Sequence, residues 1–339
     1  MTHYIVPERG SNPILSGENA NTGEIYVMNP IPISLIIDDG GPVNMFHFHD
    51  LYHPHEMAIP PSFTREFAKV CRQNGIMGKF SLVPMPAGLG RIDEKINGIP
   101  GSDLRKHIKI IKEEIEPVFS ITPEILTHYR ALNLETKVSC KHIFEDVFVA
   151  GATAEEIADY VAFSLEILSN AGLTPTGMTS PWATGNTNEE NYAKGIGMAF
   201  KRVMNAEECF YFLHSRQEEW KVPVVMVDTP ETGKVVTVPN NTKDAFWDTQ
   251  NPVKTAQARK NAKMGMDAIL SPDGKSGVMR TLFEEGTPLV FITHWQSIFS
   301  DGRNIGLEGL DVLTKRINKV FGNQIEWMPM AELAKRWTK

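Results

Sequence analysis

The stretch Ser34-Leu35-Ile36-Ile37-Asp38-Asp39-Gly40-Gly41 is a short apolar run that ends in two carboxylates and a glycine turn. An apolar run that stops at a turn is typical of a buried parallel strand. Further strands are predicted over 78–83, 124–128, 176–179, 209–214, 289–292 and 325–328, while 222–227 and 234–238 form a further strand or a hairpin. Helical patterns separate these runs, over 62–75, 102–118, 153–172, 189–204, 251–270, 278–285, 310–322 and 330–337.

Strands that alternate with helices predict an α/β chain with a parallel sheet, and seven or eight of them favour a closed barrel of the TIM-barrel kind. A length of 339 residues suits one large barrel. We therefore expect a single catalytic barrel domain over 33–339, with residues 1–32 as an N-terminal extension packed on it. Ser62 and Ser102 are the expected N-caps of the first two long helices.

The composition is that of an ordinary globular chain without a strong charge bias. Hydrophobic residues make up 42% and charged residues 22%, which excludes collagen and wholesale disorder. The 34 basic and 41 acidic residues give a formal net charge of −7, so nucleic acid and membranes are not expected as partners. The polar start of the chain lacks the features of a secretion signal, so a cytoplasmic location is expected. The sequence is also compatible with a homo-oligomer.

Polar and aromatic side chains follow several of the predicted strands. The first strand ends in Asp38-Asp39, and later strands end in His128, Pro181-Trp182, His214 and His294-Trp295. In α/β barrels the working residues gather at the carboxyl ends of the strands. The sequence therefore predicts a shared site built from carboxylates and imidazoles.

Asp38 and Asp39 carry most of this prediction. Two close carboxylates repel each other, so one readily binds a cation or takes up a proton. One of them could bind a divalent metal while the other acts as general base, or both could simply cap backbone amides in a turn. His128 is a candidate metal ligand, Asn133 could add an oxygen ligand, and His294 is a candidate general acid.

Two further groups of side chains are interpreted with alternatives left open. The stretch 46–55 contains a histidine cluster, in which His49 and His53 are reserve ligands or substrate contacts, although an exposed polar loop fits equally. Trp182 and Trp295 could stack on sugar rings or pack in the core or at the rim.

Taken in order, these residues resemble the polysaccharide deacetylase family, the NodB-homology carbohydrate esterases. The family's T-F-D-D-G strand is similar to Ile36-Ile37-Asp38-Asp39-Gly40, and its G-I-x-A-T-F-F strand to the segment 75–81. Its H-[ST]-x-x-H motif falls at 128–132, its R-x-P-[YF]-G motif is loosely matched by 180–183, and its late strand ending in histidine matches 291–294.

The resemblance implies a distorted (β/α) barrel with seven strands, and metal-dependent removal of an N- or O-linked acetyl group from a sugar. Asp38 would be the general base, Asp39 and His128 ligands of a divalent metal, most often zinc, and His294 the general acid. A backbone amide near Trp182 would share the charge of the oxyanion.

Two departures from the family motifs set further expectations. Leu132 stands where the second metal-binding histidine is expected, so Asn133 or a histidine of the 47–55 cluster would have to substitute. The arginine of the third motif is absent, so Arg130 or Lys79 would supply the positive charge beside Asp38.

Two other functions remain open at this stage. A glycoside hydrolase would pair Asp38 or Asp39 with a remote acid such as Asp228 or Asp301, across a cleft of roughly 5 to 10 Å. A carbohydrate-binding protein that has lost the chemistry would also fit the missing histidine and arginine.

Overall fold

The computed structural model describes residues 29–49, 55–214 and 221–339. Most of the predicted N-terminal extension, residues 1–32, therefore lies outside the described residues, and its last residues already belong to the first strand. None of the described helices is both long and apolar enough to span a bilayer. Cys71, Cys140 and Cys209 are free thiols.

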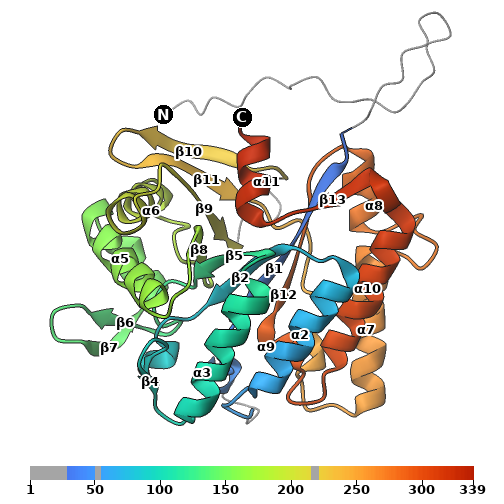
Figure 1. The fold of residues 1–339 in the computed structure, drawn as a ribbon, viewed down its shortest axis with the longest axis horizontal. Coiled ribbons are helices and arrows are strands. Elements are labelled where there is room, and N and C mark those ends of the chain that lie inside the picture. Colours follow the sequence, from blue (N-terminus) through green and yellow to red (C-terminus); the bar gives the residue numbers. More distant parts are fainter. Residues whose placement is uncertain (1–28, 50–54, 215–220) are drawn as a thin grey trace, which may run out of the picture.

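Two sheets of mainly parallel strands form the centre of the protein (Figure 1). In the first sheet, β1 (Ile31–Asp38) pairs in parallel with β12 (Leu289–His294), β2 (Gly78–Leu82) and β13 (Ile325–Trp327), and β2 pairs with β5 (Phe119–Pro123). In the second sheet, β8 (Gly177–Ser180), β9 (Glu208–Leu213) and β11 (Gly233–Val238) are parallel, and β10 (Val224–Thr229) is an antiparallel edge strand.

Isolated contacts join the two sheets at both of their meeting edges. Parallel bridges link β5 to β8, one of them between Glu124 and Thr179. At the other edge, the backbone amide of Asn241 donates to Val290 of β12, and the amide of Ile292 donates to the Thr242 hydroxyl. Within the described residues, seven parallel strands thus follow one another around a distorted barrel, and an eighth, β13, pairs with β1 off this path. This arrangement confirms the predicted fold class.

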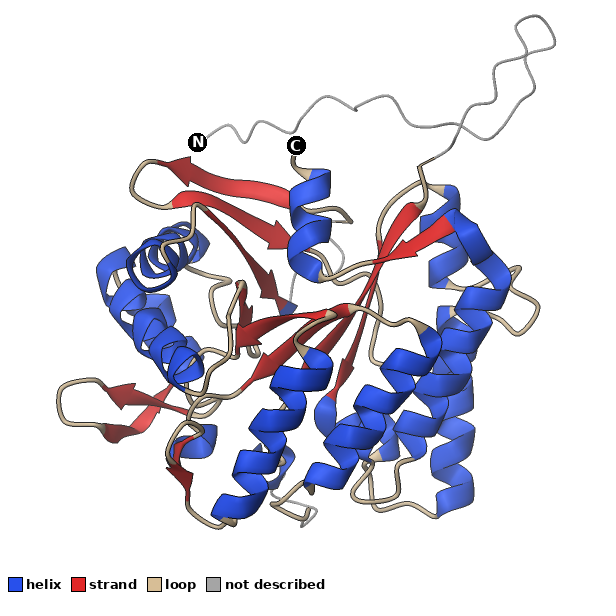
Figure 2. Ribbon diagram, viewed as in Figure 1, coloured by secondary structure: helices blue, strands red, loops and turns tan. Residues whose placement is uncertain are grey.

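Helices surround the strands on the outside (Figure 2). The longer ones are α2 (Pro61–Asn74), α3 (Gly101–Ile110), α5 (Ala154–Asn170), α6 (Glu189–Met204), α7 (Thr255–Ile269), α10 (Ile305–Phe321) and α11 (Met330–Trp337). The shorter ones are α1 (Phe46–His49), α4 (Glu145–Gly151), α8 (Val278–Glu284) and α9 (Trp295–Phe299). Two short antiparallel pairs complete the structure, β3 (Gly90–Arg91) with β4 (Lys95–Ile96), and β6 (Arg130–Asn133) with β7 (Val138–Phe144).

The hydrophobic core has two parts because alternate residues of each strand point to opposite faces. Side chains such as Ile36, Phe212 and Ile292 pack together with Met330 and Leu333 of α11. The larger part contains the other face of the strands and the apolar stripes of the surrounding helices. Because polar side chains at one strand end interrupt this packing, that end is the candidate site.

Local chemistry explains where the helices begin. The predicted caps Ser62 and Ser102 are wrong, since α2 begins after Pro60 and α3 begins after Pro100. Proline suits the start of a helix, where its missing N–H would have no partner. Gly75 ends α2 in the left-handed conformation, with φ 66°.

The third strand lies five residues earlier than the sequence pattern predicts. β5 covers Phe119–Pro123, whereas the segment predicted as a strand, 124–128, leaves the sheet. Ile125 and His128 have positive φ values, 40° and 49°, which a regular strand does not allow. As a result, Glu124 stands at the carboxyl end of a parallel strand, where a barrel places its functional side chains.

Candidate functional site

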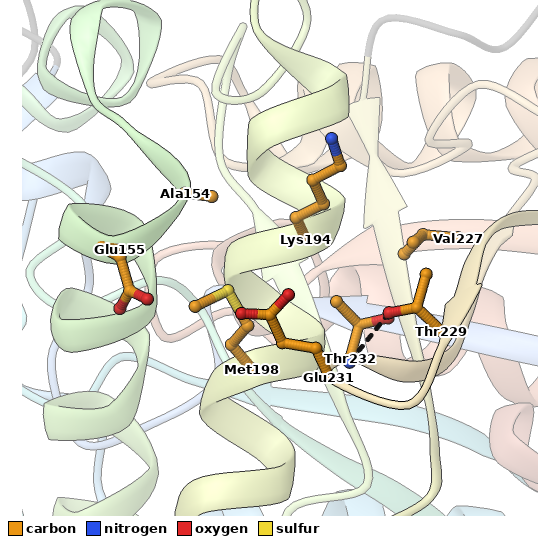
Figure 3. Close-up of a pocket in the computed structure, with 8 residues that line it drawn as sticks. All are labelled: Ala154, Glu155, Lys194, Met198, Val227, Thr229, Glu231 and Thr232. Carbon is orange, nitrogen blue, oxygen red and sulfur yellow. Dashed lines mark hydrogen bonds between the residues drawn. The ribbon is translucent and has the colours of Figure 1, made fainter.

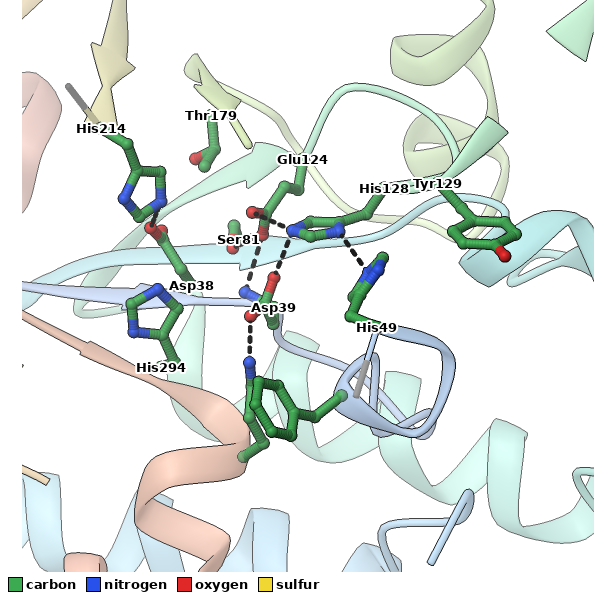
Figure 4. Close-up of polar contacts among 12 residues, drawn as sticks. Asp38, Asp39, His49, Ser81, Glu124, His128, Tyr129, Thr179, His214 and His294 are labelled. Atoms are coloured by element: carbon green, nitrogen blue, oxygen red, sulfur yellow. Dashed lines mark hydrogen bonds and ion pairs between the residues drawn. The ribbon is translucent and has the colours of Figure 1, made fainter. Parts of the chain in front are cut away.

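Asp38 and Asp39 point to two different sides of the strand end, as Figure 4 shows. Asp38 is the last residue of β1 and pairs in register with His294 of β12. Asp39 has a left-handed backbone, φ 59°, which turns its side chain toward His128. Gly40 allows this turn, because a Cβ there would lie 2.1 Å from the carbonyl oxygen of Ser81. Two clusters therefore form around neighbouring residues.

The first cluster contains Asp39, Glu124 and His128, all of them buried. His128 Nε2 lies 2.8 Å from Asp39 Oδ1 and 3.3 Å from Glu124 Oε1. The second oxygen of Glu124 accepts hydrogen bonds from the Asp39 amide and the Ser81 hydroxyl, both at 2.7 Å. Gln296 donates to the second oxygen of Asp39. These bonds leave Asp39 Oδ1 and Glu124 Oε1 facing the ring nitrogen of His128.

The electrostatics of this cluster suit a cation. Burial raises the pKa of Glu124, and the charges of Asp39 and Asp38 raise it further. Burial alone would lower the pKa of His128, but Asp39 and Glu124 outweigh it and hold this pKa well above its usual range. Asp39 Oδ1 and Glu124 Oε1 are buried, and among the described residues the polar group that faces both of them is the ring nitrogen of His128. One nitrogen cannot fully satisfy two buried carboxylate oxygens, whereas a divalent cation would satisfy both.

The second cluster surrounds Asp38, which is completely buried. Lys79 Nζ, also completely buried, lies 2.5 Å from Asp38 Oδ1 and donates to the Thr179 hydroxyl. His214 Nε2 lies 2.8 Å from Asp38 Oδ2. Burial alone would raise the pKa of Asp38, but the charge of Lys79 and the contact with His214 hold it below its usual value. Of the two cations that the sequence offered for Asp38, the structure places Lys79 there and not Arg130.

His294 belongs to the same cluster and is oriented by Asp244. His294 Nδ1 lies 2.9 Å from Asp244 Oδ2, which also accepts the His294 amide at 3.0 Å. Burial would lower the pKa of His294, but Asp244, with the charges of Asp39 and Asp38, raises it to about 9. The rings of His294 and His214 are stacked, with centroids 5.4 Å apart. A protonated imidazole thus stands beside the Asp38 carboxylate.

Aromatic rings line the side of the site next to His128. The ring of Trp182 packs edge-on against His128 at 4.7 Å and against His49 at 5.0 Å between centroids. His49 Nε2 lies 3.1 Å from His128 Nδ1. Burial and the charge of His128 lower the pKa of His49 to about 4. His49 therefore contacts a candidate ligand from behind, and Tyr129 and Phe144 extend the aromatic wall outward.

Several residues expected at the site lie elsewhere or have other partners. The Asn133 side chain accepts hydrogen bonds from the amides of Glu135 and Thr136, so it caps the turn between β6 and β7 and is exposed. Trp295 is fully buried, donates to the Gly41 carbonyl and packs against the core phenylalanines. The ligand role predicted for Asn133 is therefore corrected, and of the two alternatives for Trp295 the structure shows packing in the core. His53 lies outside the described residues.

Arg130 and the two remote acids are also placed by the structure. Arg130 lies over the Tyr129 ring, 5.4 Å from its centroid, and its buried Nε has no hydrogen-bond partner. Asp228 is exposed on the edge strand β10, and Asp301 accepts a hydrogen bond from the Glu56 amide. Within the described residues, the acid that faces Asp39 is Glu124, so the predicted pairing with a remote acid is not supported.

Three important residues were missed or left without a role by sequence reasoning. Glu124 and His128 have the spacing E-x-x-x-H, which reproduces H-x-x-x-H with a carboxylate in the first position. This signal was available, but the misplaced strand hid it. His214 was recognised only as a strand end, and Asp244 lies in a loop without a motif.

A separate hollow on the protein shares no residue with these clusters (Figure 3). Its volume is about 270 Å³, and it lies between α5, α6 and the hairpin of β10 and β11. Its lining includes Glu155, Lys194 and Glu231, without a buried unpaired group aimed into it. This hollow therefore adds no candidate group to the site at the barrel end.

Comparisons with known proteins show a likeness of fold only. No protein-family model and no curated protein sequence matches this chain. Among solved structures, Puue allantoinase is similar, with 13% identity and a TM-score of 0.48 over 90% of this chain and 89% of that one. The chitin deacetylase from Colletotrichum lindemuthianum has 11% identity and a TM-score of 0.45 over 90% and 87%. At this level of similarity, substrate and mechanism must come from the side chains themselves.

Proposed function

We propose that this protein is a divalent-metal-dependent hydrolase that removes an acetyl group, N- or O-linked, from a sugar or oligosaccharide. The observation that carries this proposal is the pair of clusters around Asp38 and Asp39. One cluster brings three buried ligand atoms within 4.8 Å of one another, and the other holds a carboxylate beside a protonated imidazole. Hydrolysis of an amide or ester needs these functions next to each other.

The metal ligands in this proposal are Asp39, Glu124 and His128, with Glu124 replacing the earlier candidate Asn133. Their two carboxylate oxygens and one imidazole nitrogen are a donor set that zinc accepts, with room left for water or substrate. A bound cation would polarise the acetyl carbonyl and make a bound water more acidic. His49 and Gln296 would keep His128 and Asp39 in position.

The other side chains act on protons and charge. Asp38 would accept a proton from the attacking water, and Lys79 keeps this carboxylate ionised before the reaction. His294, protonated and oriented by Asp244, would donate a proton to the departing amine or alcohol. A backbone amide at Trp182 would stabilise the oxyanion.

Carbohydrate fits the aromatic side of the site. Trp182, Tyr129 and Phe144 present rings beside the candidate metal cluster, and aromatic rings pack against the apolar faces of sugars. Arg130 adds a buried donor without a partner, suited to an acyl or sugar oxygen. Trp295 has no part in substrate binding because it is buried in the core.

The test combines metal analysis with product analysis. Protein stripped with a chelator is reloaded with zinc, manganese or cobalt, and acetate release is measured from N-acetylated and O-acetylated saccharides. We expect one ion per chain and acetate release that is lost with the chelator and restored by the ion. Release of reducing sugar without acetate would instead indicate a glycoside hydrolase. Glycan binding without turnover under every ion would indicate a binding protein.

A further inference from the structure

Arg130 differs from the other half-buried arginines of the described residues. The others donate hydrogen bonds to carboxylate or carbonyl oxygens: Arg91, Arg280, Arg303, Arg316 and Arg336. The guanidinium of Arg130 has no hydrogen-bond or ion-pair partner within the same part of the chain, and its Nε is buried. A half-buried charge without a partner costs free energy, so a ligand that supplies the missing acceptor would bind favourably.

Arg130 stands at the outer end of the aromatic wall beside the candidate metal cluster. Its guanidinium lies over the Tyr129 ring, 5.4 Å from the centroid, and its backbone pairs in register with Phe144. Tyr129 contacts His49, and Phe144 contacts Trp182, so these two rings continue the wall outward from the cluster. A sugar chain that packs along the wall therefore meets Arg130.

We propose that Arg130 binds a carboxylate of the substrate, and that the saccharide deacetylated at this site is therefore an acidic one, a uronate. This inference rests on the proposed function, since it assumes that an acetylated saccharide packs along the aromatic wall. It names the class of that saccharide, which the metal cluster and the proton-transfer residues leave open.

The guanidinium of Arg130 suits an anion that arrives from solvent. Nε is buried, whereas the two terminal nitrogens keep contact with the surface. N–H groups on these two nitrogens can hold both oxygens of a planar carboxylate in parallel hydrogen bonds. Burial of Nε has already removed part of the water around this charge, so an ionic hydrogen bond is stronger here than at an open surface. A neutral hydroxyl would accept one bond and leave the charge without compensation.

The charge of the hairpin of β6 and β7 agrees with an acidic substrate. From Arg130 to Phe144 the hairpin carries three basic residues, Arg130, Lys137 and Lys141, and one acid, Glu135. The whole chain has a formal net charge of −7, so this positive segment stands out from the rest. A positive segment beside a binding site attracts anions from solution.

The alternative is that Arg130 only covers the Tyr129 ring. A cation over an aromatic face is itself a stabilising contact. This contact gives the guanidinium no opposite charge, and it predicts the same activity on charged and uncharged substrates. The two explanations are therefore separated by changing the charge of the substrate while its sugar and its acetyl group stay the same.

The experiment compares each acidic saccharide with its own methyl ester, which lacks the carboxylate charge. O-acetylated oligogalacturonate and an oligosaccharide of N-acetylglucosaminuronate cover the two kinds of acetyl linkage. The zinc-loaded parent should release acetate from the acid with a kcat/KM about ten- to a hundredfold higher than from the ester, the fold-change that corresponds to a hydrogen bond with a charged group. Arg130→Met should remove this preference through KM and leave the ester unaffected.

Two further variants separate the geometry of Arg130 from its charge. Arg130→Lys keeps the charge but loses the planar pair of donors, so it should retain only part of the preference. Lys141→Met removes an exposed charge of the same hairpin and should keep the parent's preference within about twofold, because salt screens exposed charges. The methyl esters serve as a folding control, since a variant that hydrolyses them at the parent rate is folded.

Equal kcat/KM for acid and ester in the parent, or a preference that Arg130→Met keeps, would overturn the inference while the hydrolase stands. Should Arg130→Met fail to fold, Arg130→Lys decides, and an undiminished preference there would overturn the pairing with a carboxylate. An equal loss in Lys141→Met would assign the preference to general charge attraction and overturn the role of Arg130. A parent that releases no acetate from any saccharide, charged or neutral, would overturn the proposed function and this inference with it.

Discussion

Asp38 and Asp39 are neighbours in the sequence, yet their surroundings give them opposite tasks. Asp39 faces Glu124 and His128, where two buried carboxylate oxygens share one ring nitrogen. Asp38 faces a buried lysine and two histidines, where its charge is already neutralised. The difference begins with one peptide unit: Asp38 still lies in the strand, whereas Asp39 has φ 59°. Environment, rather than residue type, thus separates the two roles that we propose, cation binding for Asp39 and proton transfer for Asp38.

The largest expected effect comes from removing the charge of Glu124, a proposed metal ligand beside Asp39. Glu124→Gln keeps the shape of the side chain but removes a ligand charge, so bound metal should be lost and acetate release should fall about a thousandfold, the several kcal/mol that a metal contributes. Metal content and kcat measure this. Asn133→Ala is the matched control and should change neither, because Asn133 only caps a turn. Loss of metal in the control alone would restore Asn133 as the ligand.

The next effect comes from the acid on the Asp38 side. His294→Gln should lower kcat by about a hundredfold, at the lower end of the range for a positioned proton donor. The pKa of His294 is raised to about 9, so the protonated form is present below that pH and is lost as the pH rises past it. Activity should therefore fall on the alkaline side of about pH 9. Asp244→Asn should move this fall to lower pH, and an unmoved profile would assign it to another group.

The buried ion pair gives a prediction about stability. Lys79→Met should lower the free energy of unfolding by about 3 to 5 kcal/mol, because it leaves the Asp38 charge buried without a partner. The double variant with Asp38→Asn should recover most of this loss. Denaturant unfolding of the four proteins measures the coupling. Equal losses in the single and double variants would show that Lys79 contributes packing rather than charge.

The smallest effect concerns Glu145, which accepts a hydrogen bond from the backbone next to His128. Burial raises the pKa of Glu145 to about 7, while its carboxylate accepts hydrogen bonds from the Thr127 amide and the Tyr160 hydroxyl. A raised pKa means that the folded protein favours protonated Glu145. The contribution of this group to the free energy of unfolding is therefore complete below about pH 4.5 and is lost as the pH rises through about 7. Glu145→Gln should resist that loss, by up to about 3 kcal/mol at pH 8. Parallel unfolding profiles of parent and variant between pH 5 and 8 would contradict it.

The sequence predicted the fold well because the fold depends on repeated patterns. Apolar runs that end in turns, and stripes of period 3.6, identified the strands and helices of the barrel. Asp38, Asp39 and His294 were recognised because each directly follows such a run or ends it. His128 was recognised at the end of a strand that the pattern placed five residues too late. The end of a strand is a local feature that sequence patterns carry.

The remainder of the site depends on contacts between distant segments. Asn133 was proposed as a ligand and Glu124 was overlooked because the third strand was placed five residues too late. The backbone turns at Ile125 and His128, and no periodicity in the sequence reveals these turns. Trp295 follows His294 directly, yet its ring points into the core. Nothing local shows that Lys79 lies within 2.5 Å of Asp38, because its neighbours in the strand are ordinary core residues.

The path of the chain around the barrel has a consequence for biosynthesis. Asp39, Glu124 and His128 come from the first half of the chain, whereas Gln296 follows Asp39 by 257 residues. During synthesis, the three proposed metal ligands therefore leave the ribosome long before β12. Until β12 emerges and pairs with β1, one edge of β1 lacks its permanent neighbour. Under the proposed mechanism, a chain released before β12 is made carries the metal ligands without His294, its proton donor.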